Sequence, residues 1–210
     1  MTGFLIAMMA LNVALLLHQR WRRWQRRAPR RALERGRPAA IASLQEGSLT
    51  KIIGVIAPRA PMLMSAVLKQ PCIGYSTAVE APEATGWRPV LNSGRCASFF
   101  VTDESGTAVV EGNIVIAPHP DIGWETPPAS MFPRSDDDGS LPSLRPSLEG
   151  QTRYREILLK PGDRVTVLGR AKMEIDPAGR SSFRDPPMLN HIRGSDDAPV
   201  IVAHDMITLS

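Results

Sequence analysis

The sequence predicts a mainly β domain, a small barrel or sandwich of about six or seven strands, preceded by one N-terminal transmembrane helix. Three observations support this fold class. Short apolar and β-branched runs recur after residue 45 and are separated by Gly/Pro turns. No segment in that part shows a long 3.6-residue apolar period, so we expect little helix there. The first seventeen residues, in contrast, are almost wholly apolar.

The N-terminal apolar run predicts a membrane anchor at residues 1–20. Gly3 to Leu17 contain no charge and one strongly polar side chain, Asn12. At about 1.5 Å per residue, a helix over this run and its flanks is about 31 Å long, which matches a hydrocarbon layer of about 30 Å. A secretory signal peptide is the alternative. It requires positive charge before the apolar core and small residues at a cleavage site, whereas here the charge follows the core and bulky or basic residues occupy that place.

The basic run after the anchor, residues 21–44, is interpreted as a juxtamembrane tether interrupted by Pro29, Gly36 and Pro38. Arginine side chains can reach lipid phosphates, and tryptophan rings favour the headgroup boundary. The residues expected at this membrane interface are Arg20, Trp21, Arg22, Arg23, Trp24, Arg26 and Arg27. Because flanking arginines stay on the cytoplasmic side, we expect a single-pass protein with its N-terminus outside and its β domain, residues 45–210, in the cytoplasm.

The charge distribution separates these two parts of the chain. Residues 1–38 hold nine Arg and one Glu, a net charge of +8, whereas residues 39–210 carry a net charge of −4. A nucleic-acid-binding domain is expected to carry a basic groove in its folded part, because phosphate neutralisation supplies much of the affinity. Nucleic acid is therefore a disfavoured partner. The anionic headgroups of a lipid bilayer are the expected partner of the arginines.

The two cysteines, Cys72 and Cys96, lie in apolar, strand-like surroundings. Two cysteines cannot build a disulfide framework, so we expect two reduced, partly buried thiols. A disulfide between them remains the alternative if the predicted topology is wrong. No CxxC or Cys/His spacing indicates a zinc site, and no metal or cofactor is predicted.

The first two expected strands are residues 50–57 and 72–81. The first, "TKIIGVIA", is β-branched and is followed by two prolines. In the second, "CIGYSTAVEA", the residues at alternate positions form one apolar face, which predicts a strand with one buried side. That face consists of Ile73, Tyr75, Thr77 and Val79.

Two hairpins and a last strand are expected further along. In residues 97–112 the apolar runs "FFV" and "AVV" flank Asp103, Glu104, Ser105 and Gly106, which are turn formers. In residues 155–176 the pair Pro161–Gly162 predicts a turn between two paired strands, and residues 176–179 predict another turn. The run "APVIVAHDMI", residues 198–207, completes an OB-like set of strands.

Residues 117–150 differ from the rest of the domain. They contain seven prolines and little apolar periodicity, so we expect a long, largely disordered loop. Its acidic triplet, residues 136–138, could be offered as a divalent-ion site. We expect a solvated loop tip instead, because calcium loops need ligands spaced to wrap around the ion.

Three stretches are more specific than strand propensity. They are "IIGVIAP" followed by "PMLMSAVLKQPCIGYS" (52–76), "SFFVTDESGTAVVEG" (98–112) and "RYREILLKPGDRVTVLGRAKM" (153–173). Together they resemble the GIDE domain, also called BAM for "beside a membrane". This domain occurs in membrane-anchored mitochondrial RING-type ubiquitin ligases and in many prokaryotic membrane proteins. The positions that match its motifs are Gly54, Pro71, Cys72, Tyr75, Trp87, Phe99, Asp103, Gly106, Tyr154, Glu156, Pro161, Gly162, Asp163, Val165 and Gly169.

The resemblance covers about residues 48–207 and implies an accessory or sensing module held close to a bilayer. The family's ligases also have a second spanning helix and a RING with eight Cys/His metal ligands. We expect neither here. The four His and two Cys are scattered, so they do not form the zinc-bound platform of a RING. The resemblance therefore does not predict ligase activity.

No catalytic site is predicted. GxSxG, HExxH, Walker-loop and GxGxxG motifs are missing from the sequence. His204 and Asp205 are neighbours on an expected strand and would point to opposite faces. His119 and His191 fall in Pro- or Gly-bounded stretches, which predicts solvated loop residues. The two thiols are expected to pack rather than to act as nucleophiles.

The aromatic side chains allow two interpretations. They could form a stacking platform on an OB-like face, as in proteins that bind single strands, or they could belong to the core. We favour the core, with the adjacent Phe99 and Phe100 on opposite faces. Tyr154 and Glu156 share a face and are expected to determine the fold.

The expected function is that of a non-catalytic, membrane-anchored β domain that recognises a protein partner or monitors the membrane surface. Two alternatives remain. One is an accessory component of an enzyme system, similar to a ubiquitin ligase or a hydrolase. The other is an OB-type nucleic-acid binder.

Overall fold

The computed structural model of the chain describes residues 33, 37–118, 122–127, 152–175 and 188–204. The predicted anchor, its membrane-interface residues and most of the tether lie outside these ranges. Among the described residues, no helix has the length and apolar character needed to cross a bilayer.

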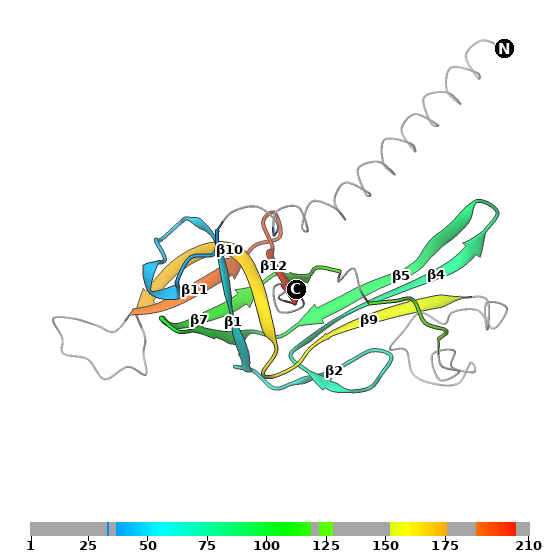
Figure 1. Cartoon of the computed structure of the whole chain (residues 1–210), viewed down its shortest axis with the longest axis horizontal. Coiled ribbons are helices and arrows are strands. Elements are labelled where there is room, and N and C mark those ends of the chain that lie inside the picture. Colours follow the sequence, from blue (N-terminus) through cyan, green and yellow to red (C-terminus); the bar gives the residue numbers. More distant parts are fainter. Residues whose placement is uncertain (1–32, 34–36, 119–121, 128–151, 176–187, 205–210) are drawn as a thin grey trace, which may run out of the picture. The chain divides into compact units, whose positions relative to one another are not determined.

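Twelve strands and one short 3-10 helix make up the described part of the chain, which is therefore mainly β, as predicted (Figure 1). The sequence predicted only six or seven strands. The elements are η1 (Ile41–Ser43), β1 (Leu49–Pro58), β2 (Leu63–Met64), β3 (Pro71–Cys72), β4 (Gly74–Glu83), β5 (Gly86–Cys96), β6 (Phe99–Asp103), β7 (Gly106–Gly112), β8 (Ile114–Ile116), β9 (Arg153–Leu159), β10 (Arg164–Ile175), β11 (Met188–Gly194) and β12 (Val200–His204).

Five strands close into a β-barrel. Their order around the ring is β1-β6-β7-β11-β10, and β10 pairs back to β1. The β7–β11 pairing is parallel, and the other four ring pairings are antiparallel. Strand β12 pairs antiparallel with β10 and parallel with β8. Closure leaves the ring itself without a free edge, which removes the usual template for edge-to-edge aggregation.

Two glycines allow strands to pass from one partner to the next. On β10, Gly169 lies between the part that pairs with β12 and the part that pairs with β11, and a Cβ there would lie 2.5 Å from a methyl of Ile192. On β1, Gly54 precedes the change from β10 to β6, and a Cβ there would lie 2.5 Å from the carbonyl oxygen of Thr102. Close backbone approach at these corners requires glycine. Both positions belong to the motifs quoted above.

The barrel core comes from alternate residues of the ring strands. Along β1 the buried residues are Thr50, Ile52, Gly54 and Ile56, which is the period of two that one buried face requires. Phe99 is fully buried. Ile41 and Leu44, which the sequence places in the tether, are also core residues, and the backbone of Ala39 donates to the carbonyl of Lys51. The folded barrel therefore includes residues before 45.

A second, three-stranded sheet has the order β5-β4-β9. Figure 1 shows β4 and β5 as a long hairpin that runs away from the ring. Its alternate residues Tyr75, Thr77 and Val79 are buried as predicted. Val67, Val79 and Tyr154 form a small cluster of their own here. The short strands β2 and β3 form a separate pair beside this sheet.

The predicted hairpin at residues 97–112 is confirmed as β6 and β7. The predicted hairpin at residues 155–176 is wrong. The turn at Pro161–Gly162 exists, but β9 pairs with β4 while β10 enters the ring, so the turn joins two different sheets. A turn sequence indicates that the chain changes direction, but it does not identify the strand with which the following strand pairs.

Parts of two predicted loops are ordered strands or bridges. His191 was expected in a solvated loop and instead lies in the middle of β11, 4% exposed. Glu125, within the loop predicted at 117–150, forms a β-bridge with Tyr154. The acidic triplet at 136–138, His119 and the turn at 176–179 lie outside the described residues.

Candidate functional site

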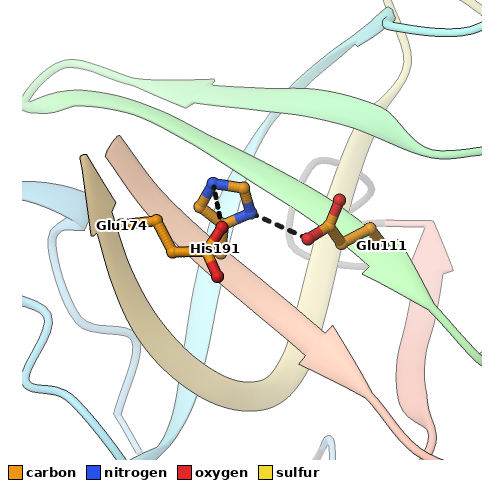
Figure 2. Close-up of side chains that lie close together, drawn as sticks. All are labelled: Glu111, Glu174 and His191. Carbon is orange, nitrogen blue, oxygen red and sulfur yellow. Dashed lines mark hydrogen bonds and ion pairs between the residues drawn. The ribbon is translucent and has the colours of Figure 1, made fainter. Parts of the chain in front are cut away.

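The densest cluster of titratable side chains among the described residues lies on β7, β10 and β11. Figure 2 shows His191 between the carboxylates of Glu111 and Glu174. The imidazole Nδ1 lies 2.9 Å from Glu111 Oε1, and Nε2 lies 3.7 Å from Glu174 Oε2. Ligand atoms of the three residues lie within 4.8 Å of one another. On composition alone, this set would suit a divalent metal ion.

The arrangement of charges does not favour a metal. Arg193 donates hydrogen bonds to both carboxylates. Glu111 also accepts from Arg59 at 2.7 Å, and Glu174 accepts from Lys172 at 2.7 Å. A divalent cation would have to displace at least one of these partners and would meet the repulsion of the rest. A metal bound to His191 would use one imidazole nitrogen, and each of the two nitrogens already faces a carboxylate (Figure 2).

Catalysis by His191 is disfavoured by its surroundings. Its side chain is only 6% exposed, and both ring nitrogens already face carboxylates. A general base must reach the proton that it removes. We therefore interpret the cluster as an ion-pair network that joins three strands of the barrel.

The carboxylates of this network have lowered pKa values. Burial opposes ionisation of Glu111, but hydrogen bonds from Arg193, Arg59 and His191 outweigh it and lower its pKa to about 2. A hydrogen bond from Lys172 is the main cause that lowers the pKa of Glu174. Both groups are anionic at neutral pH, which keeps the network paired.

A second polar centre forms around the buried side chain of Glu156 on β9. Its carboxylate accepts from the backbone N–H groups of Val67 and Leu68 at 3.0 and 2.9 Å, and from the hydroxyl of Thr77 at 2.7 Å. Three donors satisfy a buried carboxylate. Glu156, a motif position, therefore clamps the segment between β2 and β3.

Residues 59–70, which include β2 itself and the chain on both sides of it, are called the β2–β3 loop below, and Glu156 clamps the second half of this loop at Val67 and Leu68. Its base is closed by Ser65 and Gln70, which exchange a backbone hydrogen bond at 2.9 Å and a side-chain bond at 3.1 Å. Val67 is buried beneath it, whereas Met62, Met64 and Leu68 are 49%, 58% and 42% exposed. Ordered backbone thus holds three large apolar side chains in water. Such exposure marks candidate binding surfaces.

The three-stranded sheet also carries a ladder of tryptophan and arginine side chains. The guanidinium of Arg153 lies 4.2 Å from the ring centre of Trp87 and 4.4 Å from that of Trp124. Arg155 lies 4.9 Å from the Trp124 ring, and Arg153 also donates to Glu80. Trp87 lies in strand β5. These cation–π contacts hold both tryptophan rings at the surface of the sheet.

Both cysteines are free thiols. Burial, with a smaller contribution from the nearby Cys72, raises the pKa of Cys96 to about 12. Burial also raises the pKa of Cys72, followed by the charge of Glu156. The thiolate is the nucleophilic form, so neither side chain is activated. The expectation of two reduced, packed thiols agrees with this geometry.

The remaining motif positions serve turns and packing. Asp103 accepts from the N–H groups of Ser105, Gly106 and Ile41, which fixes the β6–β7 turn to η1. Asp163 accepts from the N–H of Lys160, and Gly162 has a φ of +90°, so the turn that begins at Pro161 needs both residues. Tyr75 and Val165 are buried, and Pro71 pairs with Met64. The hydroxyl of Tyr154 donates to Glu125.

His204 is the last residue of β12. Its Nε2 lies 2.9 Å from the carbonyl oxygen of Leu158 and 3.9 Å from a carboxylate oxygen of Asp163. Asp205 lies outside the described residues.

No protein-family model matches the chain, and no curated protein matches it either. The resemblance to the GIDE domain therefore rests on the motif residues alone. Function has to be inferred from the surfaces described above.

Proposed function

We propose that this chain is a membrane-anchored, non-catalytic β domain that acts as an interaction module at the membrane surface. The observation that carries this proposal is the β2–β3 loop, which exposes Met62, Met64 and Leu68 and whose second half is fixed by the buried carboxylate of Glu156. Preorganised apolar side chains lose less entropy on binding than a mobile loop would lose.

The chemistry of the polar clusters supports binding rather than catalysis. In the described residues, the carboxylates of Glu111, Glu174 and Glu156 are all engaged by donors, and the pKa values of both thiols are raised away from reactivity. The ring order and the parallel β7–β11 pairing support the OB-like part of the proposed description. OB-like barrels commonly serve as binding platforms.

The anchor part of the proposal is supported by the sequence of residues 1–27, with its apolar run and the arginines and tryptophans that follow. The topology is proposed to place the N-terminus outside and the β domain in the cytoplasm. A GIDE-like role close to a bilayer agrees with both features.

Carbonate extraction of membranes that contain the full chain tests the anchor. We expect the chain to stay in the pellet and a variant with Leu15, Leu16 and Leu17 replaced by Asp to be released. Release of the unmodified chain, or recovery of a product trimmed at its N-terminus, would contradict the proposal. A reporter fused after Ser210 that is active only outside the cytoplasm would contradict the topology.

A further inference from the structure

The β2–β3 loop, residues 59–70, points to a specific kind of partner. We infer that it docks into an anionic lipid surface, with Met62, Met64 and Leu68 entering the interface. This inference rests on the proposed function, because it names the partner of the same loop.

The charge of the loop matches anionic headgroups. Residues 58–71, "PRAPMLMSAVLKQP", contain no acid and two basic residues, Arg59, which pairs with Glu111, and Lys69. Lys69 is exposed and makes no ion pair with any described residue. Lys160, which donates to Gln70 at 2.9 Å, adds a further cation at the base of the loop. Basic side chains next to exposed apolar ones are the composition that anionic membrane surfaces attract.

The geometry of the loop also fits a lipid surface. Val67 points inward to Val79 and Tyr154, while Leu68, the next residue, points outward. The Glu156 carboxylate bonds both of their N–H groups and so fixes this division.

The small size of the loop favours lipid over protein. Three apolar side chains on a twelve-residue segment offer far less area than the roughly 800 Å² per partner of a stable protein interface. A tethered domain does not need that area, because an anchor in the same chain keeps the loop at a high effective concentration near the bilayer. Weak insertion of the three side chains into the lipid is then enough to keep the loop at the membrane surface.

The test uses the full chain reconstituted into vesicles of phosphatidylcholine and phosphatidylserine. A Met64→Cys variant is labelled with an environment-sensitive fluorophore at neutral pH, where the raised pKa values of Cys72 and Cys96 keep the native thiols protonated. We expect a blue shift of the emission and a loss of fluorescence when the lipids carry brominated acyl chains. A Thr107→Cys variant, labelled on the exposed β7 position, should show neither change.

Two substitutions sharpen the test. Leu68→Glu in the labelled chain should abolish the quenching, whereas Val115→Glu, a matched change at another exposed apolar residue, should leave it unchanged. Vesicles of phosphatidylcholine alone should give weaker quenching, because the attraction of Lys69 and Lys160 to anionic headgroups is lost.

The outcomes separate this inference from the proposed function. If the label at residue 64 stays in water while the chain remains in the carbonate pellet, lipid docking is overturned and the anchored module stands. If the label at residue 64 is shielded in native membranes but not in pure lipid vesicles, the loop binds a protein partner, and lipid docking is again overturned. Release of the chain from the pellet refutes both.

Discussion

The closed barrel and the three-stranded sheet are stabilised in different ways. The barrel has a large apolar core to which alternate residues of every ring strand contribute. The sheet shares this core through Ile157 and Leu159 of β9, and beyond them it has a satellite cluster of Val67, Val79 and Tyr154 together with directional polar contacts. Glu156 bonds the β2–β3 loop, and Arg153 joins two tryptophans to Glu80.

This difference indicates where the molecule tolerates change. Apolar burial is non-directional and tends to keep the whole ring cooperative. A region held by a few directional contacts can open locally without unfolding the rest. The exposed loop that we propose as a binding surface belongs to the second kind of region.

The largest expected effect is on the barrel. Phe99→Ala removes a fully buried ring from the core, so we expect the free energy of unfolding to fall by about 3–5 kcal/mol. Phe100→Ala is the matched control, since the neighbouring ring lies on the opposite face and is partly exposed. Denaturant titration of both variants measures the difference. Equal losses would mean that the barrel interior is not the dominant core.

A smaller and more local effect is expected at the clamp. Glu156→Gln keeps one acceptor oxygen and replaces the other with a donor, so one charge-assisted hydrogen bond to the loop backbone is lost. We expect this loss to lower the local stability by about 1.5–3 kcal/mol. Hydrogen exchange should accelerate at Val67 and Leu68 while barrel amides keep their protection. Glu104→Gln, in the exposed β6–β7 turn, is the control. Uniform acceleration across the domain would contradict local opening.

The ion-pair network should make stability depend on acid pH. Because the pKa of Glu111 falls from 4.5 to about 2 on folding, its contribution is complete above about pH 4.5 and is lost as the pH falls to about 2. Denaturant midpoints measured across this range should drop less steeply in Glu111→Gln than in the unmodified chain. If both proteins show the same slope, the network does not stabilise the barrel.

The smallest effect is expected at the tryptophan ladder. Trp87 is 46% exposed, so Trp87→Ala should cost about 0.5–1 kcal/mol through the lost contact with Arg153. Trp87→Phe retains an aromatic face and should therefore lose less stability than Trp87→Ala. Thermal unfolding of the two variants checks this order. A loss as large as that of Phe99→Ala would mean that the sheet carries a larger share of stability than its small core suggests.

The sequence predicted the features that depend on local pattern. The β-branched run at residues 50–57 and the prolines after it identified β1, and the turn formers from Asp103 to Gly106 identified the β6–β7 hairpin. Two reduced cysteines and a mainly β domain were also predictable.

The features that depend on distant partners were not predictable. The turn at Pro161–Gly162 has the same sequence whether the following strand pairs back or enters another sheet. His191 was missed because "MLNHIRG" is not strongly apolar, and its partner Glu111 lies 80 residues away. The alternation of His191 and Arg193 with the buried Ile192 was the available signal. The clamp by Glu156 had no local signal, since its backbone partners lie 88 and 89 residues away.

The spacing of Thr77 and Glu156 along the chain has a consequence for how the molecule folds. These side chains meet across 79 residues, whereas Asp103 and Gly106 meet across three. Closing a long loop is entropically more expensive than closing a short one, so contacts of high sequence separation slow the search for the native state. After dilution from denaturant, the β6–β7 turn should gain amide protection early, and the segment beside Glu156 should be among the last to gain it.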